Sequence, residues 1–197
     1  MLIPVKDFRQ AKARLAAVLS AEHRVRLARW TAERVVAAAA PLPVFVACDD
    51  TDVADWAEAA GATVLWRAGM GLNPAVRDGI TTLSRAGIEN VVVAHSDLPA
   101  PSSLANLVLS GAAVLVPDRR RDGTNVIAVP TGAGFEPAYG SRSFQRHLAQ
   151  VVDLGLIVRV VADPFLALDI DTPEDLAHPV VINALPAWLP TSPDNRP

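Results

Sequence analysis

Short apolar runs alternate with longer segments of helical spacing along this chain, and this alternation limits its fold more than any other feature. The apolar runs, which we expect to be strands, lie at residues 2–5, 44–48, 62–66, 91–94, 113–117, 124–129 and 156–161. The segments expected to be helices are 21–39, 53–60, 73–87, 102–109 and 143–154. Such alternation predicts an α/β fold, in which helices cover both faces of a mainly parallel sheet. The strands 113–117 and 124–129 follow one another closely enough to pair as a hairpin.

Length and composition indicate one globular domain. A chain of 197 residues with 51% hydrophobic residues can bury a full core. We expect a single domain over residues 1–178 and a loosely ordered, proline-rich tail over 179–197, whose apolar patch at 187–189 could dock back or meet a partner. No apolar segment approaches the roughly 20 residues that cross a bilayer. Since residues 1–6 resemble a strand more than a secretory signal, we expect a cytoplasmic protein without a membrane partner.

One strand leads directly to a carboxylate. The apolar run 91–94 is followed by His95, Ser96 and Asp97, and then by Leu98 and a proline. Ligands of open α/β sheets collect outside the carboxyl ends of the strands, so Asp97 could hold a cation beside a bound phosphate. Strands also end at aspartates that only cap the next helix. This stretch alone leaves both interpretations open.

A second acidic motif lies near the end of the predicted domain. Asp169 and Asp171 alternate along an extended segment, so their side chains point to one side. Mg²⁺ prefers hard oxygen ligands and is commonly held by a few carboxylates together with substrate phosphates. The two acids could therefore share a magnesium site with Asp97. The alternative is that Asp171 and Thr172 only begin a helix, because Pro173 and the residues after it form a near capping box.

The basic residues are unevenly distributed by type. Of the 18 basic residues, 16 are Arg, and the two Lys residues, Lys6 and Lys12, both follow the first strand. Lysine is a compact point charge on a flexible stem, which suits phosphate binding. Two solvated lysines placed there by chance are the alternative. A net charge of −3 gives no general attraction to nucleic acid, so an anionic ligand must be held locally.

Other loops offer polar groups but no established motif. The glycines of residues 69–73 could let a ligand approach the backbone, and Gly140 precedes a helix start where an anion would be favoured. Each could also be an ordinary turn. The single cysteine, Cys48, provides neither a disulfide nor a zinc cluster. The P-loop, G-x-S-x-G and first-turn G-x-G-x-x-G patterns are missing, which disfavours P-loop hydrolases, nucleophile-elbow hydrolases and Rossmann dehydrogenases.

Taken in order, these motifs resemble the phosphoenolpyruvate or 2-phospho-L-lactate guanylyltransferase family of coenzyme F420 biosynthesis. That family is related to the nucleotidyltransferases that act on molybdenum cofactor and on sugar phosphates. The resemblance covers roughly residues 2–175. It is carried by residues 4–6 with 11–15, 71–73, 97–99, 117–118 with 123–125, 140 with 143, and 169–176. It implies a Rossmann-like three-layer α/β sandwich with a mainly parallel, mixed sheet of the nucleotidyltransferase, or glycosyltransferase-A, type.

The resemblance also implies roles for individual residues. The implied metal ligands, which would hold Mg²⁺, are Asp97, Asp169 and Asp171. The implied catalytic set, which surrounds the GTP phosphates, is Lys6, Lys12 and Arg14 together with Asp97. The implied nucleotide-binding residues are Pro4, Val5, Lys6, Lys12, Gly71, Leu72 and Asn73. The implied acceptor-binding residues are Thr124, Gly140 and Ser143. One departure is the pair His95-Ser96, where relatives often have Pro-Ala or a similar pair.

The implied reaction transfers GMP from GTP to the phosphate of phosphoenolpyruvate or 2-phospho-L-lactate and releases pyrophosphate. Another nucleotidyltransferase of the molybdenum-cofactor or sugar-phosphate type, a D-x-D glycosyltransferase and a non-catalytic nucleotide-binding regulator are the alternatives. The sequence leaves open whether the acceptor is one of these two acids or a phosphoglycerate. The guanine preference rests on the resemblance alone, and a homodimer is one open option for the oligomeric state.

Overall fold

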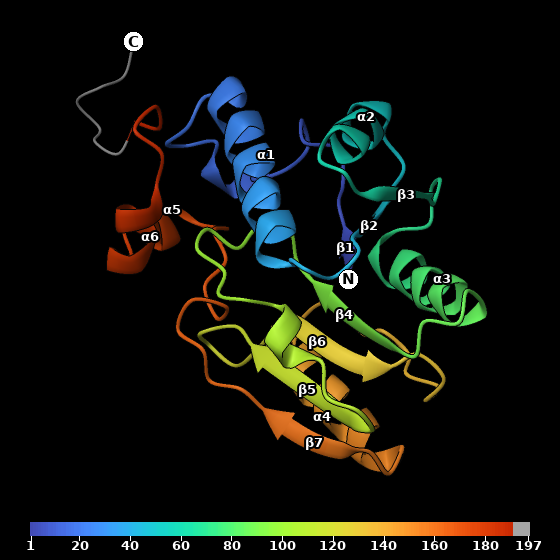
Figure 1. The fold of residues 1–197 in the computed structure, drawn as a ribbon. Helices are drawn as coiled ribbons and strands as arrows, with labels where there is room; N and C mark the ends of the chain where they lie inside the picture. Colours follow the sequence, from blue (N-terminus) through green and yellow to red (C-terminus); the bar gives the residue numbers. More distant parts are fainter. Residues whose placement is uncertain (191–197) are drawn as a thin grey trace.

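A seven-stranded sheet forms the centre of the computed structural model, which describes residues 1–190 (Figure 1). The strands are β1 (Leu2–Pro4), β2 (Phe45–Cys48), β3 (Thr63–Trp66), β4 (Asn90–Ala94), β5 (Ala112–Pro117), β6 (Thr124–Pro130) and β7 (Ile157–Val160). Their spatial order is β3-β2-β1-β4-β6-β5-β7. β6 runs antiparallel to both β4 and β5, and the other neighbouring pairs are parallel. The predicted mixed, mainly parallel sheet and the hairpin of β5 with β6 are therefore confirmed.

Helices cover both faces of this sheet. The α-helices are α1 (Ala21–Ala38), α2 (Thr51–Ala59), α3 (Leu72–Arg85), α4 (Ser143–Asp153), α5 (Pro173–Leu176) and α6 (Pro179–Ala184), and the 3₁₀ turns are η1 (Ala13–Leu15) and η2 (Ala105–Leu107). Buried side chains of α1, such as Ala32 and Val35, pack with those of α2 in one core cluster, and those of α3 and α4 pack in another. In β4, Val92 belongs to the first cluster and Val91 and Val93 to the second, as the alternation of side chains along a strand requires. The result is the predicted three-layer sandwich.

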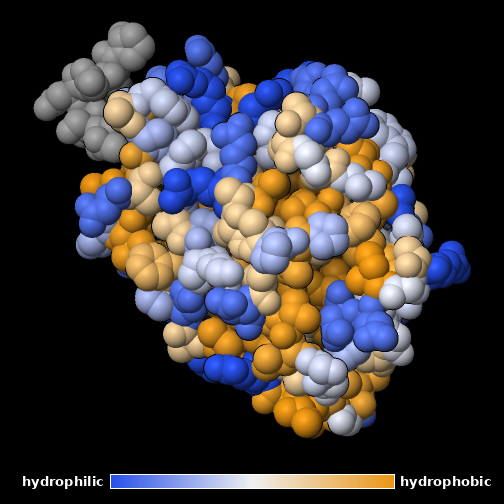
Figure 2. Space-filling model, in the orientation of Figure 1, coloured by the Kyte–Doolittle hydropathy of each residue, from blue (hydrophilic) through white to orange (hydrophobic). Residues whose placement is uncertain are grey.

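Surface polarity follows this arrangement. α1 buries Ala28, Ala32 and Val35 and turns charged residues such as Glu33 outward. Figure 2 shows hydrophilic residues gathered over the upper part of this face, where α1 and α2 lie, with more hydrophobic surface below them. Within residues 1–190, no helix combines the length and the apolarity that crossing a bilayer requires.

Two of the helices begin at the capping residues that the sequence indicates, and one predicted helix is wrong. Ser20 caps α1 by accepting a hydrogen bond from the His23 amide (3.2 Å), and Thr172 begins α5 with a capping box. The helix predicted over 102–109 is wrong, because that segment forms only the short turn η2. The Leu104 amide donates to the carbonyl of Ala38 at the end of α1 (3.0 Å), which fixes this segment against the neighbouring helix. The Leu104 side chain is fully buried in the core.

The chain after residue 178 packs against the domain instead of forming a loose tail up to residue 190. A third cluster, which we call the C-terminal core, contains buried residues from five parts of the chain. These are Leu15, Leu19, Leu27, Leu168, Ile170, Val181 and Leu189. The patch 187–189 docks back: Leu189 is buried, and the Trp188 ring lies under the Arg26 guanidinium, 4.2 Å from its centroid. The expected disorder is corrected for 179–190, because these apolar side chains bury there; residues 191–197 lie outside the described residues.

Replacing Leu189 with Ala tests whether this docking stabilises the domain. Leu189 is 4% exposed, whereas Ile182 on α6 is 49% exposed. Truncating a buried leucine costs about 2–5 kcal/mol. We expect Leu189→Ala to lower the free energy of unfolding in urea by about 2 kcal/mol, the low end because the site lies close to the chain end. The control Ile182→Ala should change it by less than about 0.5 kcal/mol. Equal effects of the two substitutions would contradict the docking.

Candidate active site at the carboxyl edge of the sheet

A cleft of about 220 Å³ opens at the carboxyl ends of β1 and β4. These strands are parallel neighbours, so the loops that follow them meet at one edge. The cleft is lined by Pro4, Val5, Lys6, Phe8, Gln10, Ala11, Lys12, Ala28, Thr31, Leu72, His95, Ser96, Asp97 and Asp171. A second cavity of about 270 Å³ lies between residues 102–109 and 159–166 and contains none of the predicted site residues. Asp97, Asp171 and both lysines line the smaller cleft, which is therefore the candidate site; Asp169 is not among its lining residues.

Three carboxylates converge at this cleft. Asp97, Asp169 and Asp171 each place one carboxylate oxygen within 4.8 Å of the others. The Ile170 amide donates to the Asp97 carbonyl (3.3 Å), which ties the two acidic loops together. The Ile170 side chain is fully buried in the C-terminal core, and the alternation of the extended segment turns both neighbouring acids to the opposite side. The predicted clustering of the three acids is thus confirmed, and their metal role stays a prediction.

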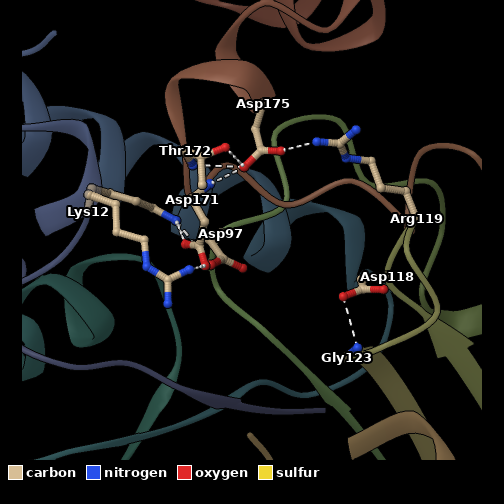
Figure 3. Close-up of polar contacts among 9 residues, drawn as sticks. Lys12, Asp97, Asp118, Arg119, Gly123, Asp171, Thr172 and Asp175 are labelled. Atoms are coloured by element: carbon tan, nitrogen blue, oxygen red, sulfur yellow. Dashed lines mark hydrogen bonds and ion pairs between the residues drawn. The ribbon is translucent and has the colours of Figure 1, made fainter. Parts of the chain in front are cut away.

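Lys12 is the counterion of this acidic cluster. Its Nζ lies 3.0 Å from Asp97 Oδ2 and 3.5 Å from Asp171 Oδ1, and its side chain is 5% exposed (Figure 3). Lys12 has φ = 58°, a left-handed conformation that is unfavourable for a residue with a Cβ. Arg14 is peripheral, since its side chain is 75% exposed and its Nη1 lies 3.8 Å from Asp171 Oδ2. Lys6 is exposed at the cleft wall.

The electrostatics of the cluster fit a divalent cation. Burial raises the pKa of Asp169 to about 7, and the charges of Asp97 and Asp171 add to this effect. Burial also acts to raise the pKa of Asp97, but the positive charge of Lys12, helped by His95, holds it below its ordinary value. Asp97 Oδ1 is buried and accepts no hydrogen bond from residues 1–190. The three carboxylates, including the orphaned Asp97 oxygen, are the hard oxygen ligands that Mg²⁺ prefers.

The predicted nucleotide-binding residues divide into two groups. Pro4, Val5 and Leu72 line the cleft with the two lysines. Asn73 does not line it: its Nδ2 donates to the Tyr139 carbonyl (3.2 Å) and its Oδ1 accepts from the Tyr139 amide (2.7 Å). Gly71 is the N-cap of α3 at φ = 69°, a conformation that favours glycine. In this structure, Asn73 therefore holds the loop around residue 139 onto α3.

The predicted acceptor-binding residues lie together near the start of α4 and outside the residues that line the cleft. Thr124 and Ser143 are each 2% exposed, and the Ser143 amide donates to the Gly140 carbonyl (3.0 Å). His147 Nε2 accepts from the Ala138 amide (2.8 Å), so His147 Nδ1 carries the proton and donates to Thr124 Oγ1 (3.0 Å). Burial, with smaller contributions from Arg146 and His95, lowers the pKa of His147 to about 4. Acceptor binding by these residues stays a prediction.

Several cleft residues have no signal in the sequence. Ala28 and Thr31 reach the cleft from the inner face of α1, where their spacing indicates only a helix. The Thr31 hydroxyl donates to the Ala28 carbonyl (3.0 Å). His95 and Ser96 line the cleft beside Asp97, at the positions where the sequence departs from the family pattern. In the sequence, only their position next to Asp97 could have indicated that His95 and Ser96 line the cleft.

Comparison with known proteins agrees with this geometry. The family model described as "Guanylyl transferase CofC like" matches residues 1–183. The chain belongs to this family. A phosphoenolpyruvate guanylyltransferase from Sphaerobacter thermophilus is 36% identical over 185 residues, which cover 89% of each chain. A 3-phospho-D-glycerate guanylyltransferase from Phenylobacterium zucineum is 34% identical over 187 residues, covering 88% of this chain and 86% of the relative. The resemblance seen in the sequence is confirmed, and the protein is a nucleotidyltransferase-type enzyme.

Solved structures of more distant proteins share the fold. A putative nucleotide-diphospho-sugar transferase from Desulfovibrio desulfuricans aligns with a TM-score of 0.71 at 19% identity, over 89% of this chain and 83% of that chain. A nucleotidyl transferase from Methanothermobacter thermautotroptrophicus aligns with a TM-score of 0.62 at 13% identity, over 89% and 93%. The CofC-like chain therefore has the nucleotidyltransferase fold that the resemblance implies.

The raised pKa of Asp169 predicts that the metal-free protein loses folding stability as the pH rises. The ordinary pKa of 3.8 applies to the unfolded chain, and the folded value is about 7. Between these values the unfolded state releases a proton that the folded state retains, so stability falls as pH rises and the penalty is complete above pH 7. With EDTA present, we expect Asp169→Asn to raise the free energy of unfolding by about 2 kcal/mol at pH 8.5 and much less at pH 4.

The control for this measurement is Asp153→Asn at the exposed end of α4. It should shift the free energy of unfolding by a similar small amount at both pH values, because exposed charges contribute little. Urea unfolding at the two pH values gives the comparison. If Asp169→Asn had the same effect at pH 4 and pH 8.5, the cause assigned to its pKa shift would be wrong.

Removing the Lys12 charge should destabilise the metal-free protein and leave the protein bound to Mg²⁺ less affected. Losing one partner of a buried ion pair costs about 3–5 kcal/mol. We expect Lys12→Met to lower the free energy of unfolding by about 3 kcal/mol in EDTA at pH 8, and we expect saturating Mg²⁺ to restore most of the loss. Lys6→Met, at an exposed position, is the matched control and should cost little under both conditions. A loss that Mg²⁺ leaves unchanged would argue against a shared cation site.

Proposed function

We propose that this protein transfers GMP from GTP to the phosphate group of phosphoenolpyruvate and releases pyrophosphate, as a step of coenzyme F420 biosynthesis. The observation that carries the proposal is the cluster of three acids and Lys12 at the cleft between β1 and β4. The family match supports guanylyl transfer. Relatives from Sphaerobacter thermophilus and Rubrobacter xylanophilus, each 36% identical, are named phosphoenolpyruvate guanylyltransferases and support the acceptor.

Asp97, Asp169 and Asp171 are the residues that would hold Mg²⁺, because their oxygens converge and Asp97 Oδ1 has no other partner within residues 1–190. Mg²⁺, when bound, would neutralise negative charge on the triphosphate and on the leaving pyrophosphate. The protein supplies a partly buried, acidic site in which such charge compensation is stronger than in bulk water.

The basic residues would bind the phosphates. Lys12 neutralises Asp97 and Asp171 in this structure, and a cation on the same acids would replace it in that role. The Lys12 ammonium would then be available to the triphosphate, with Lys6 at the cleft wall and Arg14 at its rim. Three flexible cations around a highly charged substrate suit this task, since each can follow a phosphate oxygen as charge develops.

The bond changes are those of a displacement at phosphorus. An acceptor phosphate oxygen forms a bond to the α-phosphorus of GTP, and the bond from that phosphorus to the oxygen that bridges the α- and β-phosphates breaks, so that this oxygen leaves with pyrophosphate. A phosphate monoester has a second pKa of about 6, so the nucleophile is already ionised near neutral pH. No protein base is needed to remove a proton. The residues of the cleft therefore act by binding, alignment and charge compensation.

Asp97→Asn tests this assignment with a substitution that keeps the side-chain shape. We expect pyrophosphate release from GTP and phosphoenolpyruvate to fall by at least about 100-fold, because the central carboxylate of the cluster loses its charge. Asp55→Asn, at an exposed position of α2, should retain full activity. Circular dichroism should show that both variants remain folded. Undiminished pyrophosphate release by Asp97→Asn would refute the proposed role.

The acceptor is tested in the same assay. The wild-type protein is given GTP with phosphoenolpyruvate, 2-phospho-L-lactate or 3-phospho-D-glycerate, and the product is identified by mass spectrometry. We expect the largest kcat/KM with phosphoenolpyruvate. A preference for 3-phospho-D-glycerate would instead match the function named for the Phenylobacterium zucineum relative. GTP binding without any product would favour a nucleotide-binding regulator over an enzyme of this chemistry.

A further inference from the structure

The side chain of Asp175 organises the backbone that carries the D-x-D motif. Its Oδ2 accepts hydrogen bonds from the Asp171 amide (3.0 Å), the Thr172 amide (2.8 Å) and the Thr172 hydroxyl (2.9 Å) (Figure 3). The Asp175 side chain is 7% exposed. The bond from the Thr172 amide belongs to the capping box of α5, whereas the bond from the Asp171 amide reaches beyond the helix into the acidic segment. One carboxylate oxygen thus fixes the backbone of a proposed metal ligand.

Arg119 holds the other oxygen of the same carboxylate. Its Nη2 donates to Asp175 Oδ1, and its backbone amide donates to the Ala167 carbonyl (2.9 Å). The bond to Ala167 joins the turn after β5 to the residues before the D-x-D motif, and the bond to Asp175 joins it to the residues after the motif. Arg119 and Asp175 are 56 positions apart in the sequence. The arginine therefore supports the motif from outside its own loop.

The turn that presents Arg119 is itself well fixed. Asp118 Oδ1 accepts from the Asp122 amide (3.0 Å) and Asp118 Oδ2 from the Gly123 amide (2.9 Å). A Cβ at position 123 would lie 2.8 Å from Asp118 Oδ2, so a larger residue there would displace the Asp118 carboxylate. Figure 3 shows this turn beside the pair of Arg119 and Asp175. A rigid base allows the arginine to hold Asp175 in one place.

A capping role alone does not account for Arg119. The capping box of α5 is complete with Thr172 and Asp175, and α5 has only 4 residues. The Asp171 side chain is 44% exposed, so few packing contacts on the cleft side restrain it. The position of Asp171 depends on Ile170, which is buried in the C-terminal core, and on the hydrogen bond from the Asp171 amide to the Asp175 carboxylate. Disturbing Asp175 would let Asp171 move relative to Asp97.

We propose that Arg119 is a positioning residue that acts through Asp175 to hold the D-x-D motif in the geometry that binds the divalent cation. The inference rests on the metal role assigned to Asp97, Asp169 and Asp171 under the proposed function. Residues that orient metal ligands without touching the metal typically change metal affinity by about 10–100-fold when they are replaced. Arg119 makes one contact with Asp175, so the low end of this range applies.

The experiment compares Arg119→Met, Arg119→Lys and Arg120→Met with the wild-type protein. Arg120 is the exposed neighbour of Arg119 on the same turn and has no ion pair among the described residues, so it is the matched control. Binding of Mn²⁺ to the substrate-free protein is measured by electron paramagnetic resonance. The Mg²⁺ concentration that gives half-maximal pyrophosphate release is measured in parallel, and melting temperatures are recorded for all proteins.

For Arg119→Met we expect about tenfold weaker Mn²⁺ binding and a similar increase in the half-maximal Mg²⁺ concentration, with kcat at saturating Mg²⁺ within about twofold of wild type. Arg119→Lys keeps a positive charge that can contact Asp175. Its Mn²⁺ affinity and its half-maximal Mg²⁺ concentration should therefore be within about threefold of the wild-type values. Arg120→Met should match wild type. A merely structural role would lower the melting temperature without changing metal affinity.

Two results would overturn the inference, and they are distinguishable. If Arg119→Met binds Mn²⁺ as tightly as the wild-type protein, with or without a lower melting temperature, the positioning role of Arg119 is wrong. The metal assignment of the proposed function is then unaffected. If instead the wild-type protein binds no Mn²⁺, or binds it as well after Asp97→Asn, the metal assignment of the proposed function fails as well. Should Arg119→Met be unfolded, Arg119→Gln, which is polar but uncharged, takes its place: a metal affinity below that of Arg120→Met supports positioning, and equal affinities contradict it.

Discussion

The ion pairs of Lys12 with Asp97 and Asp171 are the interaction on which the arrangement of this site depends. Three carboxylates within 4.8 Å of one another repel, and burial strengthens that repulsion. Lys12 Nζ, 3.0 Å from Asp97, is the compensating charge in the protein alone. A cation on the same acids would take its place. The site is therefore arranged to hold positive charge.

Gathering such charges requires strong apolar anchors beside them. Leu98 follows Asp97, Ile170 separates Asp169 from Asp171, and Leu15 follows Arg14; all three apolar side chains are fully buried. Burying a leucine or isoleucine contributes about 1.5–3 kcal/mol, which offsets part of the cost of bringing like charges together. The segments near the charged residues are thus held by their neighbours. Leu15 and Ile170 both pack in the C-terminal core, so residues 179–190 help to support two loops of the cleft.

Much of the fold and part of the site could be predicted from the sequence. The strands were predicted from apolar runs of four to six residues; the central ones bury on both faces of the sheet, whereas β3 and β7 lie at its edges and are largely exposed. The three acids and Lys12 were found because they follow strands or an alternating segment, and these edges meet. The helix predicted over 102–109 was wrong because tertiary contacts decided the path of this segment. The Leu104 side chain is buried in the core, and its backbone amide donates a hydrogen bond to α1. The tail was misjudged because its proline-rich composition does not show where its apolar residues can pack.

By itself, the sequence determined the layered α/β architecture, the strand ends at which charge collects and the family to which the chain belongs. These properties depend on local spacing and on motif order, which a single chain displays directly. Only the tertiary structure decided which groups touch. It placed Asn73 on the backbone of Tyr139, buried Thr124 and Ser143 near α4, and joined Arg119 to Asp175 across 56 positions. Such contacts depend on how distant elements pack, and no local pattern encodes that packing.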